Sequence, residues 1–125
     1  VTLENVMEES QREELLASDQ PLVRALGRIL DVYYDFHQPQ FGRRCSPLHD
    51  PLAAAIAVGT VKAVDSPWVN VIVDDTEGPG RGQTIADLRG QRLGPIDQEG
   101  AHVRMVLKTD RPFADHLVAR ILGRE

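Results

Sequence analysis

The chain has 125 residues, enough for one domain with one modest core. It is 42% hydrophobic and 26% charged, which is ordinary for soluble globular proteins. The formal net charge of -5 argues against nucleic acid or an anionic membrane as a partner, because both require a basic surface. The single cysteine, Cys45, excludes an internal disulfide and is typical of a reducing compartment, so we expect a cytoplasmic protein with a structural thiol.

The N-terminal part of the chain predicts two helices separated by a proline. Residues 8–18 are rich in helix formers, and Pro21 is typical of the first turn of a new helix. From Leu22 onwards apolar residues recur at spacings of three and four, which predicts one face of a helix that ends near Pro39. The apolar positions are Leu22, Ala25, Leu26, Ile29, Val32, Tyr33 and Phe36, and the opposite face carries Arg24, Arg28, Asp31 and Asp35.

A loop and a third helix are expected next. Residues 41–48 contain glycine and proline and indicate a loop. Asp50 and Pro51 then indicate a helix start, because Asp is a favoured N-cap and Pro is favoured at the first helical position. Residues 52–58 are apolar on all sides, which is typical of a buried helix.

The remainder of the chain changes to a strand pattern. Valines alternate over residues 69–73, a glycine-rich turn follows at 78–82, and residues 83–88 fit a return strand. Residues 102–108 alternate again, and residues 113–121 have the spacing of a closing amphipathic helix. The order of elements places the chain in the α/β or α+β class, with about four helices and three strands.

Several short motifs occur in a defined order along the chain. Residues 45–53 read CSPLHDPLA, residues 71–78 read VIVDDTEG, and residues 81–84 read RGQT, with Asp87 shortly after. This ordered set resembles the inosine–uridine type nucleoside hydrolases, which share the His-Asp-Pro triplet, the alanine-rich helix behind it and the strand pair. The closing strand and helix over 103–122 also resemble the end of that family.

The resemblance spans essentially the whole chain and implies an open α/β sheet that cleaves the N-glycosidic bond of nucleosides. It implies that residues 1–125 form a single segment, the C-terminal portion of such a domain. The family's N-terminal Asp-x-Asp-Pro-Gly-x-Asp-Asp stretch, which provides most of the calcium and ribose site, has no counterpart in this sequence. We therefore expect either a missing N-terminal portion or self-association.

Four residues inherit roles from the resemblance. Asp50 is implied as a Ca²⁺ ligand and His49 as the acid that protonates the leaving base. Tyr33 and His37 lie one helical turn apart and are candidates for binding the base. Ca²⁺ takes six to eight oxygens and Asp50 offers at most two. We therefore expect this chain alone neither to hold calcium tightly nor to hydrolyse nucleosides.

Other interpretations of these residues remain open. Asp50 could be a simple N-cap, His49 a loop histidine, Tyr33 a core residue and His37 a helix-end residue. The chain could be a non-catalytic assembly or regulatory module, or a relic of the family. A metal-dependent phosphohydrolase with a His-Asp pair is a remote alternative, because such proteins are nearly all helical.

Overall fold

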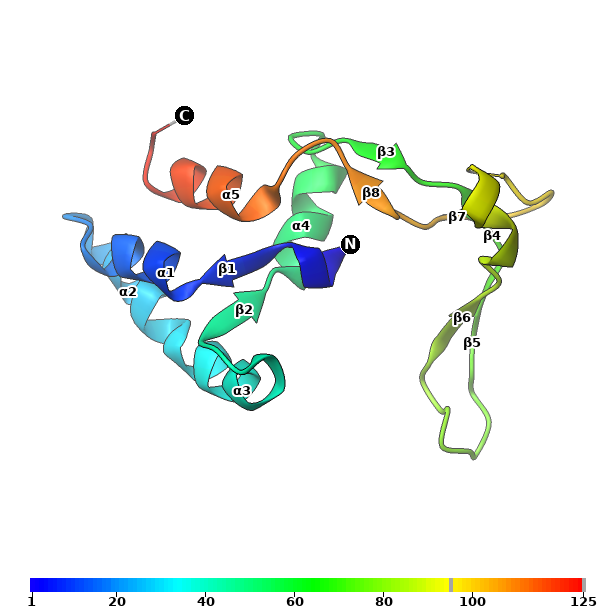
Figure 1. The fold of residues 1–125 in the computed structure, drawn as a ribbon, viewed down its shortest axis with the longest axis horizontal. Helices are drawn as coiled ribbons and strands as arrows, with labels where there is room; N and C mark the ends of the chain where they lie inside the picture. Colours follow the sequence, from blue (N-terminus) through cyan, green and yellow to red (C-terminus); the bar gives the residue numbers. More distant parts are fainter. Residues whose placement is uncertain (95, 125) are drawn as a thin grey trace. The chain divides into compact units, whose positions relative to one another are not determined.

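The computed structural model describes residues 1–94 and 96–124. The chain forms two compact units: Val1–Lys62 together with Arg111–Glu125, and Ala63–Asp110 (Figure 1). The first unit is mainly helical and the second consists mainly of short strands. The expected mixed α and β class is confirmed.

The described residues of the first unit form one small sheet and five α-helices. Its elements are η1 (Thr2–Glu4), β1 (Val6–Glu8), α1 (Glu9–Leu16), α2 (Pro21–Ile29), α3 (Asp31–Phe41), β2 (Cys45–Pro47), α4 (His49–Ala57) and α5 (Phe113–Ile121). Strands β1 and β2 pair antiparallel, with Met7 opposite Ser46. The expected loop before α4 therefore contains a strand, which the sequence did not indicate because three consecutive buried residues show no alternation.

The single helix expected after Pro21 is two helices that meet at Leu30. α2 ends at Ile29, and α3 continues past Pro39 to Phe41 before Gly42 ends it with a φ of 67°. The regularly spaced apolar face of this region is largely exposed, whereas Val23 and Tyr34 are buried. On the charged side of this region, Asp31 forms an ion pair with Arg12 of α1 and Asp35 forms one with Arg44, just before β2.

Helix α4 differs from the expectation at its start and in its burial. It begins at His49, with Leu48 as the N-cap and no side-chain capping bond, so Asp50 lies within the first turn and is not the N-cap. Only Leu52 and Ala55 of this helix are buried, and Ala53 is exposed. The expectation of a wholly buried helix is wrong for this chain, because the described residues pack against one side of it only.

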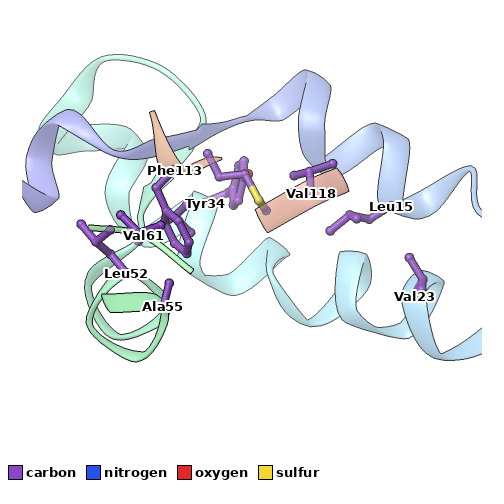
Figure 2. Close-up of a cluster of buried hydrophobic side chains, with 10 residues drawn as sticks. Leu15, Val23, Tyr34, Leu52, Ala55, Val61, Phe113 and Val118 are labelled. Carbon is purple, nitrogen blue, oxygen red and sulfur yellow. The ribbon is translucent and has the colours of Figure 1, made fainter. Parts of the chain in front are cut away.

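The core of the first unit joins both ends of the chain. It consists of Met7, Leu15, Val23, Tyr34, Leu48, Leu52, Ala55, Val61, Phe113 and Val118 (Figure 2). At the start of α5 the Phe113 N–H donates to the Asn5 Oδ1 atom at 3.0 Å in a buried hydrogen bond. This bond links residues 108 positions apart and holds α5 against the N-terminal segment.

In the second unit, the part of the chain that the structure describes forms three antiparallel strand pairs. Its elements are β3 (Ala63–Asp65), β4 (Trp68–Val69), β5 (Val71–Val73), β6 (Thr84–Ala86), η2 (Arg89–Leu93), β7 (Val103–Arg104) and β8 (Lys108–Thr109). β5 pairs with β6 as the expected hairpin, β4 pairs with β7, and β3 pairs with β8. The expected strand 69–73 is broken at Asn70, whose N–H donates to the Gln98 side chain at 2.8 Å.

Candidate functional site

One open pocket of about 760 Å³ lies on the first unit and is bordered by α3 and by the segment that leads from β2 into α4. Its lining residues are Leu30, Val32, Tyr33, Phe36, His37, Ser46, Pro47, Leu48, His49, Asp50 and Pro51. All four residues singled out in the sequence, Tyr33, His37, His49 and Asp50, line this pocket. The fold thus brings together two stretches that are separated along the chain.

Helix α3 provides the aromatic wall of the pocket. His37 Nδ1 lies 2.8 Å from the Tyr33 carbonyl oxygen. A carbonyl oxygen can only accept, so Nδ1 carries a proton, and whenever the ring is neutral Nε2 is an acceptor. The His37 ring also contacts Phe36 edge-on, with centroids 5.1 Å apart, which fixes its orientation further. Tyr33 is 55% exposed, which excludes its interpretation as a core residue.

The opposite wall is the first turn of α4. His49 and Asp50 are both exposed, and the buried Leu48 just before them anchors the turn by donating its N–H to the Asn5 carbonyl at 3.0 Å. The first N–H groups of a helix have no partner within the helix, and the helix dipole favours negative charge there. The Asp50 carboxylate therefore lies where a negative charge is stabilised.

Ser46 lines the pocket and was not singled out in the sequence. It is 5% exposed and sits in β2, three residues before His49. Its hydroxyl can both donate and accept a hydrogen bond. A lone serine in an apparent loop carries no pattern that marks it, so only the fold identifies it as a pocket residue.

Cys45 lies on the core side of the same strand. It is fully buried, and burial raises the pKa of its thiol. A protonated, inaccessible thiol is a poor nucleophile. This agrees with the structural role expected for Cys45.

The pocket does not by itself fit a calcium ion. Within residues 1–94 and 96–124 no group of three or more His, Cys, Asp or Glu side chains is close enough to hold a metal. Asp50 offers two oxygens, far fewer than Ca²⁺ requires.

Within residues 1–94 and 96–124 no helix is long and apolar enough to cross a membrane.

Comparisons with known proteins agree with the fold and with the order of motifs. The family profile described as "Inosine-uridine preferring nucleoside hydrolase" matches residues 1–115. The probable uridine nucleosidase 2 of Arabidopsis thaliana is 33% identical over 93 residues, which cover 74% of this chain and 26% of that protein.

Two solved structures are similar across almost the whole chain. A plant nucleoside hydrolase, the PpNRh1 enzyme, matches with a TM-score of 0.77 and 21% identity over 98% of this chain and 39% of its own. The purine-preferring ribonucleoside hydrolase of Gardnerella vaginalis matches with a TM-score of 0.73 and 26% identity over 98% of this chain and 37% of its own. The chain thus spans well under half the length of these relatives, and it belongs to the inosine-uridine preferring nucleoside hydrolase family.

Proposed function

We propose that this chain contributes the leaving-group side of a nucleoside N-ribohydrolase site, which cleaves a purine or pyrimidine nucleoside into free base and ribose. The observation that carries the proposal is the pocket lined jointly by Tyr33, His37, His49 and Asp50. The family match supports the reaction class. The named relatives include a probable uridine nucleosidase and a purine-preferring hydrolase, so the base preference stays open.

The chemistry of the reaction assigns a role to each wall. The bond breaks through an oxocarbenium-like ribose, and its electrons pass to a ring nitrogen of the base. In the proposed mechanism His49 donates a proton to the departing base, which makes the base a better leaving group. Tyr33 and His37 hold the base from the facing wall, where Nε2 of neutral His37 can accept a hydrogen bond from a base N–H.

Asp50 is proposed as one ligand of a Ca²⁺ ion whose remaining ligands lie outside this chain. The argument is the small donor set of the pocket, since calcium needs several carboxylates or carbonyls and Asp50 is the only carboxylate among the described lining residues. The complete site would then need a complementary polypeptide segment rich in aspartate. Cytoplasmic localisation is part of the same proposal and follows from the lone buried thiol.

A non-catalytic assembly module is the second candidate. The observation in its favour is the exposed apolar surface of the first unit, including Leu22 at 81% and Val58 at 74% exposure. Exposed apolar surface of this kind is typical of an interface. A phosphohydrolase with a His-Asp pair is disfavoured, because His49 and Asp50 open a helix and the second unit consists of strands.

The direct test is release of hypoxanthine from inosine and of uracil from uridine by the purified chain with added Ca²⁺. We expect no release, because the water-activating and ribose-binding groups are missing. Activity that His49→Ala abolishes would mean that this chain holds a complete site.

Binding of the free bases tests the pocket independently of turnover. We expect hypoxanthine or uracil to shift the NMR signals of the His37 and His49 rings in the unmodified chain. His102, which does not line the pocket, is the internal reference. If neither base moves the His37 and His49 signals at millimolar concentration, the assembly module becomes the better account.

A further inference from the structure

We infer that Arg44 is a positioning residue: it fixes α3 against β2 and so sets the spacing between the two walls of the pocket. The contacts that hold the two walls do not depend on any function. That their spacing matters for binding a base rests on the proposed function. Arg44 immediately precedes β2 and does not line the pocket. Any effect it has on the site is therefore transmitted through other residues.

The Arg44 guanidinium binds three carboxylates from two helices. Its Nε atom donates to Glu9 Oε2 on α1 at 2.9 Å, and its two terminal nitrogens donate to Asp31 and Asp35 on α3. Asp31 and Asp35 are four residues apart and so lie on one face of α3. The planar fork of arginine suits several carboxylates at once, whereas a lysine ammonium acts as a single point charge. One side chain thus ties α1, α3 and the start of β2 together.

Arg12 completes the network from the buried side. Its side chain is 10% exposed and contacts Glu9 at 2.6 Å and Asp31 at 2.8 Å. The Arg12 Nε atom also donates to the Gly27 carbonyl at 2.8 Å. Arg12 therefore still holds Asp31 when Arg44 is removed, whereas Asp35 loses its ion pair with Arg44.

The network surrounds Tyr34, the residue next to the pocket residue Tyr33. The guanidinium carbons of Arg12 and Arg44 lie 5.7 and 5.9 Å from the centre of the Tyr34 ring, and the Tyr34 hydroxyl donates to the Glu8 carbonyl at 3.1 Å. Successive residues of an α-helix point about 100° apart. With Tyr34 fixed in the core, the Tyr33 side chain is turned towards the pocket.

The Arg44–Asp35 ion pair also bears on the position of His37. Asp35 lies between Tyr33 and His37 in α3, and His37 hydrogen-bonds back to the Tyr33 carbonyl. Loss of the Arg44–Asp35 pair leaves this part of α3 held mainly by Tyr34. The single Nδ1–H tautomer of His37 then becomes a spectroscopic signature of a correctly placed α3.

The test compares Arg44→Ala and Arg44→Lys with Arg43→Ala in the full chain, without any nucleoside. Arg43 is the matched control, because it is adjacent and ion-paired with Glu8 at 2.9 Å. Its guanidinium carbon also lies 6.0 Å from the centre of the Phe41 ring at the end of α3. Imidazole nitrogen NMR at about pH 8.5, where histidine is neutral, reports the His37 tautomer. Amide exchange over α3 reports the local opening of that helix.

We expect Arg44→Ala to mix the two His37 tautomers and to speed α3 amide exchange roughly tenfold. Arg43→Ala should change both signals far less, because the Arg44 bonds to Asp31 and Asp35 remain in place, and Arg44→Lys should fall between the two. Equal effects of Arg44→Ala and Arg43→Ala, or a lower melting temperature with an unchanged His37 tautomer, would overturn the inference. If Arg44→Ala does not fold, Arg44→Lys and Asp35→Asn test the inference by the same two measurements, the His37 tautomer and amide exchange over α3. Neither measurement depends on whether the pocket binds nucleosides.

Discussion

At the residue scale, the pocket combines groups that a sequence pattern can mark with groups that it cannot. His49 and Asp50 stand in a short motif, so their types and order already point to a site. Ser46 belongs to the same pocket but resembles any loop serine until β2 is seen to pair with β1. Arg44 is further removed, because its three carboxylate partners are 9 to 35 residues away in sequence.

Cys45 provides a residue-scale prediction about reactivity. Its side chain is fully buried and burial raises its pKa, so both access and thiolate formation are suppressed. We expect an aromatic disulfide reagent at pH 8 to label the native chain at least about a hundredfold more slowly than the chain unfolded in guanidinium. Comparable rates in the two states would show that β2 is not held against the core, and Cys45→Ser, which should not react, checks the assignment.

At the element scale, the sequence predicts elements better than their burial. The closing helix and the β5–β6 hairpin follow from local signals, a proline before Phe113 and alternating valines before a glycine-rich turn. Apolar spacing also identifies a face on α2 and α3 but not which side is covered, because that depends on distant partners such as Arg12. Strands of two or three residues, such as β2 and β7, are too short to carry a periodic signal.

The 3₁₀-helix η2 provides an element-scale prediction about pH. The Arg89 side chain and backbone N–H both donate to Asp87 just before this helix, and these hydrogen bonds lower the pKa of the Asp87 carboxyl from 3.8 to about 2. A lowered pKa in the folded state means that the ionised carboxylate stabilises the fold. That contribution is complete above about pH 4 and is lost as the pH falls through about 2.

The measurement is a carbon-13 NMR titration of the Asp87 carboxyl, with the amide signals of residues 89–91 followed in parallel. We expect the two sets to titrate together near pH 2. Arg89→Ala should return the Asp87 pKa towards 3.8, and Asp87→Asn should remove the pH dependence of the amide signals. A titration near pH 3.8 in the unmodified chain would mean that the Arg89 contacts do not persist in solution.

At the scale of the whole molecule, the described hydrophobic core belongs to one unit. The ten described residues of this core all lie in Val1–Lys62 or Arg111–Glu125. Among the described apolar residues of the second unit, leaving proline aside, Val69 alone has a buried side chain. Side chains such as Ile72 and Ile85 are exposed. Paired strands without a hydrophobic face against a core are only marginally stable in water. The solved relatives contain more than half of their chain beyond the part that matches, so further surfaces that could cover such side chains exist in those proteins.

This distribution predicts two levels of stability within one chain. We expect native-state hydrogen exchange to protect amides in α1 and α4 at least about a hundredfold more than amides in the β5–β6 hairpin, because opening the hairpin exposes little new apolar surface. Leu52→Ala, which empties part of the core, should lower the protection of the first unit by about 2–5 kcal/mol and leave that of the hairpin almost unchanged. Ile72→Ala is the comparison, since this side chain is 64% exposed and its loss should change neither unit much. The contrary result would be uniform protection in both units, with Leu52→Ala lowering the protection of both equally. The chain would then unfold as one cooperative body, and the hairpin would be stabilised by more than its own strand pairing.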